Sequence, residues 1–199
     1  MINFDAELEE MTATKNLMNS YKLYFLKALI VHASSSKTSF SFYNMACWMC
    51  AYSFADACEL GARIRPLDRL YDIACLLIER EGLLESSKVS EVYETALSTK
   101  SKQISNAIES LCNYVPYRLL AYLWTRELKG KTDKQKNQLI EELAQNENRC
   151  IYSIVYILQN QRGIEINPEW ITFFSMNRER LVSWIDHKID LFVRGERQR

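Results

Sequence analysis

The sequence predicts an all-α protein, folded as a single multi-helix bundle of about six to eight helices. Its 199 residues include five glycines and three prolines, where average usage gives roughly 14 and 10. Because these residues mark turns, their scarcity leaves long uninterrupted segments, and apolar residues recur along most of them at helical spacing. We expect one helical domain over residues 15–194, a flexible leader or short helix over 1–14, and a basic tail over 195–199.

The first part of the chain contains two strong helix signals. Residues 15–33 carry apolar side chains at helical spacing and are expected to form the first firm helix. A hydroxyl-rich loop over 34–39 then precedes a helix over about 41–61 that is apolar on nearly all sides and is therefore expected to be central. Gly61 is well placed to end it.

The middle of the chain is expected to continue in the same way. Pro66 begins a third helix, and Gly82 ends it. The segment 88–113 has an apolar stripe that is interrupted by the polar residues 98–103. This pattern fits one long helix or two shorter ones.

The last part mixes clear and ambiguous signals. Pro116 is expected to begin a short helix, the lysine-rich loop 129–136 follows it, and a weaker helix covers about 133–147. Residues 150–159 are apolar and fit either a helix or a strand. Asn167-Pro168-Glu169 then supplies a cap, a first-turn proline and a first-turn acid, which predict a final long helix.

Composition and charge exclude several classes of protein. Lys+Arg and Asp+Glu both number 25, so no global field recruits nucleic acid or acidic membrane. The acidic N-terminus has no signal-peptide pattern, and the apolar stretch Phe40–Ala55 is shorter than the ~20 residues that span a bilayer. We therefore expect a cytoplasmic protein without a membrane partner.

The residues that usually carry chemistry are scarce. Two histidines lie far apart in the sequence, and no phosphate-binding glycine loop or metalloprotease motif is present. Cys47-x-x-Cys50 looks like half of a zinc site, but no second pair follows, so the six cysteines are expected to be buried free thiols. We expect no metal, no cofactor and no catalysis by this chain alone.

Basic side chains provide the candidate contacts to nucleic acid. Arg118 follows a rigid turn, where it is expected either to pair with Asp68 or Asp72 or to anchor a phosphate or a partner's carboxylate. The other candidates are a dense lysine run and two arginines near the C-terminus: Lys129, Lys131, Lys134, Lys136, Arg194 and Arg197. A solvated loop is the alternative interpretation of the lysine run.

Aromatic residues of the final helix provide a candidate protein interface. Trp170, Trp184 and Phe192 are most simply part of the core, but a long hydrophobic helix near the C-terminus can also contact a partner, and self-association is one form of this.

Four segments together resemble a known family. They are the Asn19-Ser20-Tyr21-Lys22 helix start, Met45 to Met49 with Trp48, the turn Val115-Pro116-Tyr117-Arg118, and Trp170, Asn177, Leu181 and Trp184. In this order they resemble the helical N-terminal region of bacterial proteins that carry an HNH-endonuclease domain. The family's histidine-containing nuclease module has no counterpart before Arg199, so no catalytic residue is carried over.

This resemblance implies a non-catalytic helical module for recognition of DNA or of a partner, such as a nuclease domain, in restriction or phage defence. The alternative is a regulatory or protein-interaction bundle with no role in nucleic-acid binding, which the balanced charge favours.

Overall fold

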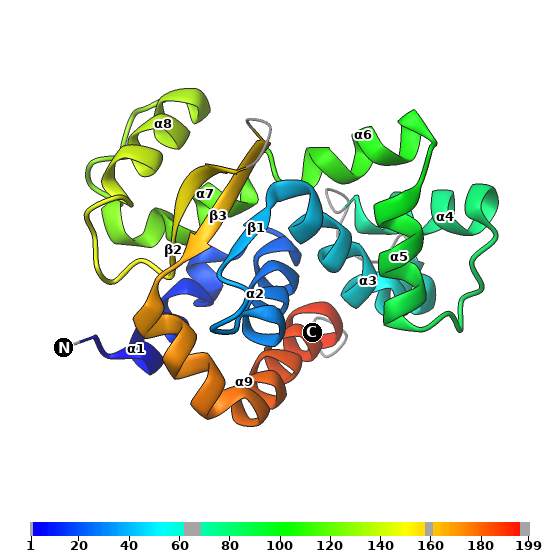
Figure 1. The fold of residues 1–199 in the computed structure, drawn as a ribbon, viewed down its shortest axis with the longest axis horizontal. Coiled ribbons are helices and arrows are strands. Elements are labelled where there is room, and N and C mark those ends of the chain that lie inside the picture. Colours follow the sequence, from blue (N-terminus) through cyan, green and yellow to red (C-terminus); the bar gives the residue numbers. More distant parts are fainter. Residues whose placement is uncertain (1, 62–68, 158–160, 196–199) are drawn as a thin grey trace.

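The computed structural model describes residues 2–61, 69–157 and 161–195. These residues are mostly helical, as predicted, and the helices surround a small antiparallel sheet of three strands (Figure 1). The strictly all-α assignment is therefore wrong. None of the described helices combines the length and the apolar character that crossing a bilayer requires.

The N-terminal segment contains a short helix that packs on the C-terminal one. Helix α1 (Phe4–Met11) begins at Asn3, whose side chain accepts a hydrogen bond from the Ala6 amide. Leu8 and Met11 are buried, and the ring of Phe4 stacks on Phe173 with centroids 4.6 Å apart. A short 3₁₀ turn, η1 (Thr14–Asn16), follows.

Three long helices contribute many of the buried side chains of the core. Helix α2 (Tyr21–His32) begins later than residue 15 because η1 is a separate turn. Helix α3 (Phe42–Leu60) is capped by the Ser41 side chain and ends at Gly61, as predicted. Helix α9 (Pro168–Arg194) is capped by Asn167 and contacts α2 along its length (Figure 1).

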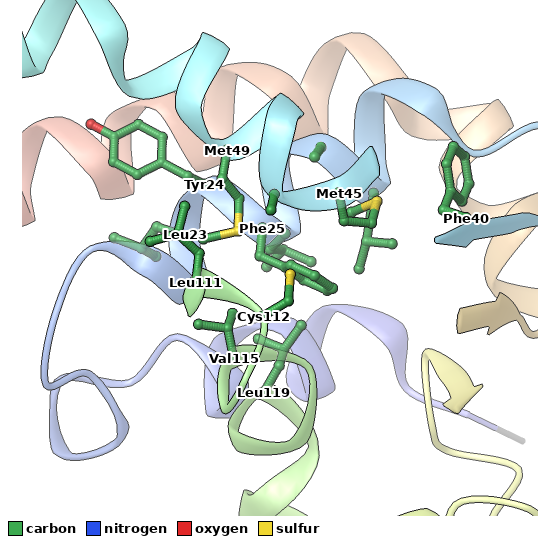
Figure 2. Packing of buried hydrophobic residues seen from close by; sticks show 14 of the residues in the cluster. Leu23, Tyr24, Phe25, Phe40, Met45, Met49, Leu111, Cys112, Val115 and Leu119 are labelled. Carbon is green, nitrogen blue, oxygen red and sulfur yellow. The ribbon is translucent and has the colours of Figure 1, made fainter. Parts of the chain in front are cut away.

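The core lies where α2 and α3 meet residues 111–119 (Figure 2). Met45 and Met49 of α3 point toward Phe25 of α2, while Cys112 and Leu119 approach from the opposite side (Figure 2). All five side chains are buried. The unbranched methionines fill irregular space between these helices.

A second group of helices packs beside α3. Helix α4 (Leu70–Glu81) ends at Gly82, which adopts the left-handed conformation that favours glycine. The segment 88–113 forms two helices, α5 (Val89–Ser98) and α6 (Lys102–Leu111), because its polar centre leaves the helical conformation at Thr99. The predicted start of α4 at Pro66 lies outside the described residues.

The chain then crosses to the sheet side of the molecule. Helix α7 (Val115–Leu120) contains Pro116 in its first turn and continues into the 3₁₀ turn η3 (Ala121–Trp124). Helix α8 (Asp133–Leu143) begins with a capping box, in which Thr132 and Gln135 exchange hydrogen bonds between side chain and backbone.

The sheet has the order β1-β3-β2, with β1 (Ser39–Ser41), β2 (Tyr152–Ile157) and β3 (Gln161–Ile166) all antiparallel. The ambiguous segment 150–159 thus forms a strand over most of its length, and β1 and β3 were not predicted. Gly163 belongs to the central strand β3, which lies between β1 and β2. A Cβ at this position would lie 2.5 Å from the Phe40 carbonyl oxygen. Only a glycine allows β1 and β3 to lie this close.

Candidate functional site

The predicted lysine run lies on one protruding stretch, here called the basic segment (residues 126–136), which links η3 to the first turn of α8. It has five basic residues and two acidic ones, and Leu128 anchors it in the core. Lys129, Lys131 and Lys134 are exposed, and Lys136 is half-buried. Among the residues that the structure describes, these lysines have no ion-pair partner. The segment therefore presents uncompensated positive charge.

The position of two of these lysines is unfavourable for the helix. Lys134 and Lys136 lie in the first turn of α8, where the helix dipole is positive. A cation at this end of a helix costs roughly 0.3–1 kcal/mol. An anion bound here would be stabilised both by the lysines and by the helix terminus.

Arg118 extends this positive region. Its guanidinium binds Asp133, within the basic segment, and lies 5.9 Å from the ring centroid of Tyr114. The predicted pairing with Asp72 is not formed, and Asp68 lies outside the described residues. Burial, together with the charge of Arg118, lowers the pKa of Lys22 to about 8. Burial is the larger cause of this pKa shift, and the charge of Arg118 adds to it.

Of the two candidate arginines near the C-terminus, Arg194 does not join this region. Arg194 pairs with three carboxylates, Asp56, Glu59 and Asp190, so it is not a free phosphate contact in this conformation. It also lies near the end of α9, away from α8 (Figure 1). Arg197 lies outside the described residues.

The aromatic side chains of α9 that are candidates for a partner interface mainly contact other parts of this chain. Trp170 is fully buried, and its indole nitrogen donates to the Arg149 carbonyl, so it belongs to the core and not to a partner interface. Trp184 donates to Glu9 of α1 across 2.8 Å. Phe192 is half-buried and packs against the core.

A polar cleft of about 780 Å³, which the sequence analysis did not predict, adjoins the basic segment. It lies between α8, the turn from α6 to α7, and β3. The following residues line it: Asn113, Tyr114, Lys134, Asn137, Gln138, Glu141, Glu142, Gln145 and Arg162. Its volume is within the range of ordinary ligand sites.

One arginine that lines this cleft is held by several side chains. Arg162 of β3 donates to the hydroxyl of Tyr117 across 2.8 Å and to that of Tyr156 across 3.3 Å. Its Nη2 lies 3.4 Å from a carboxylate oxygen of Glu141. The hydrogen bond to Tyr156 raises the pKa of Arg162, and burial raises that of Tyr117 to about 12. The guanidinium is therefore a permanent, well-oriented charge.

The α8 side of the cleft offers hydrogen-bond acceptors. The side-chain nitrogen of Asn137 donates to the Asn113 carbonyl across 3.1 Å, which fixes the orientation of its amide. Its Oδ1 is buried and has no donor among the described residues. Glu142 accepts from Gln138 across 3.2 Å. The acceptors that the α8 side presents to a ligand are therefore the carboxylates of Glu141 and Glu142 and the side-chain amide of Gln138.

A second cleft, of about 650 Å³, continues from the first. Both clefts are lined by Asn113 and Arg162, and the second extends past Ser105 and Glu109 of α6 to the exposed Leu97 of α5. Together the two clefts form a groove from α8 to the end of α5. Such a groove suits an extended ligand.

Other clusters give no sign of chemistry. Cys47 and Cys50 are buried free thiols, and burial raises the pKa of Cys47 to about 12. In the described part of the chain, no three His, Cys, Asp or Glu side chains converge on a point where a metal ion could bind.

Comparison with family models, with curated proteins and with solved structures finds no match to this chain.

Proposed function

We propose that this protein is a non-catalytic helical module that binds DNA through the basic segment. The observation that carries the proposal is the group of four lysines at 129, 131, 134 and 136, which follow one another closely in the sequence and have no ion-pair partner in the described part of the molecule. Phosphate contacts of this kind supply most of the affinity in sequence-independent DNA binding.

The balanced net charge does not oppose this function, because the positive charge is local. On α9, ion pairs offset the charge of Arg180, Lys188 and Arg194. The basic segment has five basic residues against two acidic ones, Glu127 and Asp133, and Arg118 already binds Asp133. A phosphate backbone is therefore attracted to one part of the surface.

The proposal includes the relationship to the helical N-terminal region of HNH-endonuclease proteins, with a nuclease domain or another protein as partner, in restriction or phage defence. Its support is the order of the four sequence motifs. Two of them begin helices: Asn19-Ser20 precedes α2, and Val115-Pro116 opens α7. These motifs are structural, so the DNA contact rests on the lysines alone.

A titration with labelled DNA tests the proposal. We would use a duplex and a single strand of about 16 nucleotides at about 50 mM salt, where phosphate contacts are strongest. The test variant replaces Lys129, Lys131, Lys134 and Lys136 with glutamine. The matched control also introduces glutamine, at four exposed cations near α5. These are Arg80, Lys88, Lys100 and Lys102.

We expect the wild type and the control to bind and the basic-segment variant to lose at least tenfold in affinity. The proposal fails if neither DNA form binds to the wild type, or if both variants lose the same affinity. Since none of the four lysines is paired, the test variant should keep its fold.

The second candidate function is a protein-interaction bundle without a nucleic-acid role. The observation in its favour is that Met176 and Leu191 of α9 are 80% and 55% exposed. Light scattering tests it: a dimer that Met176→Glu dissociates would support this function, and a strict monomer would oppose self-association.

A further inference from the structure

The cleft beside α8 and the basic segment share a residue. Lys134 belongs to the basic segment and also lines the cleft, and Asn137, Gln138 and Glu141 continue the same face of α8 away from it. A ligand whose phosphates lie on the lysines is therefore positioned to place an attached group in the cleft.

The lining of the cleft does not suit a phosphate. It contains two cations, Lys134 and Arg162, and two carboxylates, Glu141 and Glu142, so its charge is balanced. Carboxylates repel phosphate, but they accept hydrogen bonds from the amino groups of bases, and side-chain amides pair with base edges.

An aromatic ring stands at the mouth of the cleft. The Tyr114 side chain is 49% exposed and lines the cleft, while Arg118 lies near its ring. Unstacked bases commonly stack on exposed tyrosine rings in proteins that bind single strands. The ring, the acceptors and the fixed Arg162 together match a base better than they match a phosphate or a peptide backbone.

We propose that the cleft receives an unstacked base of single-stranded DNA, with Tyr114 as the stacking platform and the α8 side chains as hydrogen-bond partners. The inference rests on the proposed DNA-binding function and specifies which form of DNA is preferred. A duplex keeps its bases stacked and paired, so it offers only its phosphates to the basic segment. The second cleft leaves space for the next nucleotides of the strand.

Binding of a single strand and of a duplex to stacking variants tests this inference. Tyr114→Ala removes the ring, Tyr114→Phe keeps it, and Gln138→Ala removes one α8 partner from an exposed position. The probes are labelled single strands of dA, dC and dT and a duplex of equal length, at about 50 mM and 200 mM salt. Thermal melting checks that each variant is folded.

We expect the wild type to bind at least one single strand about tenfold more tightly than the duplex. Tyr114→Ala should weaken single-strand binding by about tenfold, the factor that stacking of one base supplies, and Tyr114→Phe should restore it. Neither Tyr114 variant should change duplex affinity or the dependence on salt. Gln138→Ala should weaken some of the three strands more than others.

The inference is overturned if Tyr114→Ala lowers the affinities for single strand and duplex equally, or lowers neither, while the basic-segment variant still loses binding. That outcome leaves the proposed function standing. Absence of binding to every probe overturns both. If Tyr114→Ala does not fold, Gln138→Ala decides: a change in strand preference supports the inference, and unchanged affinity for all strands contradicts it.

Discussion

The Arg162 guanidinium donates to the hydroxyl of Tyr117 across 2.8 Å and ties β3 to α7 where the two clefts meet. Residues 45 positions apart thus hold the floor of the groove, which no local sequence pattern indicates. The Tyr117 ring is 1% exposed, while the Arg162 side chain is half-exposed. The bond therefore anchors a charge at the boundary between core and solvent.

Removal of the Tyr117 hydroxyl should leave the Arg162 side chain with one hydrogen bond fewer. Tyr117→Phe keeps the ring and should lower the free energy of unfolding by about 1 kcal/mol, a typical net value for one hydrogen bond. In an Arg162→Met background the same change should cost less, because its partner is already absent. Chemical denaturation of the four proteins measures this. Equal costs in both backgrounds would show that the two side chains are not coupled.

Gly163 should tolerate no side chain. The Cβ in Gly163→Ala meets the Phe40 carbonyl oxygen, so β1 must move, and we expect a loss of about 1–3 kcal/mol. Gly195→Ala is the control because its Cβ meets no atom within 4 Å and its φ is −67°. Thermal melting of both variants measures the difference. Similar melting temperatures would contradict the close β1–β3 pairing.

The sequence predicted the helices better than the sheet, for physical reasons. Helix ends such as Gly61 and Asn167 carry local stop and cap signals that the sequence analysis used, whereas the cap of α3 is Ser41 and not a residue of the loop 34–39. Strand β1 is three residues long and β3 contains a glycine, so neither presents a clear alternation. Their pairing depends on contact between residues 39–41 and 163–165, which only the folded chain brings together.

The same limit applies to the candidate site. The lysine run was visible because it is continuous in sequence, whereas Asn113, Asn137 and Arg162 come from three separate elements. One signal was present: Lys134, Asn137 and Glu141 follow helical spacing on α8, and Gln145 lies just after its end. A polar face of this kind predicts solvent contact equally well, so the cleft could not be inferred from it.

The N-terminal helix should be a stable part of the fold. Leu8 is 1% exposed, so Leu8→Ala should cost about 2–5 kcal/mol. Leu84→Ala, at a leucine that is 68% exposed, should change the stability by less than about 0.5 kcal/mol. Chemical denaturation compares the two variants. A small effect at Leu8 would favour the flexible leader that the sequence also allowed.

Stability should fall in mild acid because of His32. Its ring stacks on Trp48 with centroids 3.8 Å apart, and Nε2 lies 2.8 Å from the Tyr52 hydroxyl. Burial, aided by the charges of Lys37 and Arg178, lowers the pKa of His32 to about 4. Between about pH 4 and pH 6.5 the unfolded chain therefore binds a proton at His32 that the folded protein does not. The stability that neutral His32 contributes is complete above about pH 6.5 and is lost as the pH falls toward 4.

His32→Phe keeps an aromatic ring in the stack and removes the titrating group. Denaturation at several pH values between 7 and 4.5 should give a smaller loss of stability for this variant than for the wild type. The matched control is His187→Phe, at an exposed position, and its loss of stability between these pH values should equal that of the wild type. Identical profiles for the wild type and His32→Phe would contradict the assignment to His32.

The most direct test of the central claim is the salt dependence of duplex DNA binding by the wild type and by the variant with glutamine at 129, 131, 134 and 136. Each lysine that contacts a phosphate contributes about one unit to the slope of log affinity against log salt concentration. We predict a slope about two to four units shallower for the variant, and an unchanged slope for the control at 80, 88, 100 and 102. Equal slopes for all three proteins would contradict DNA binding by the basic segment.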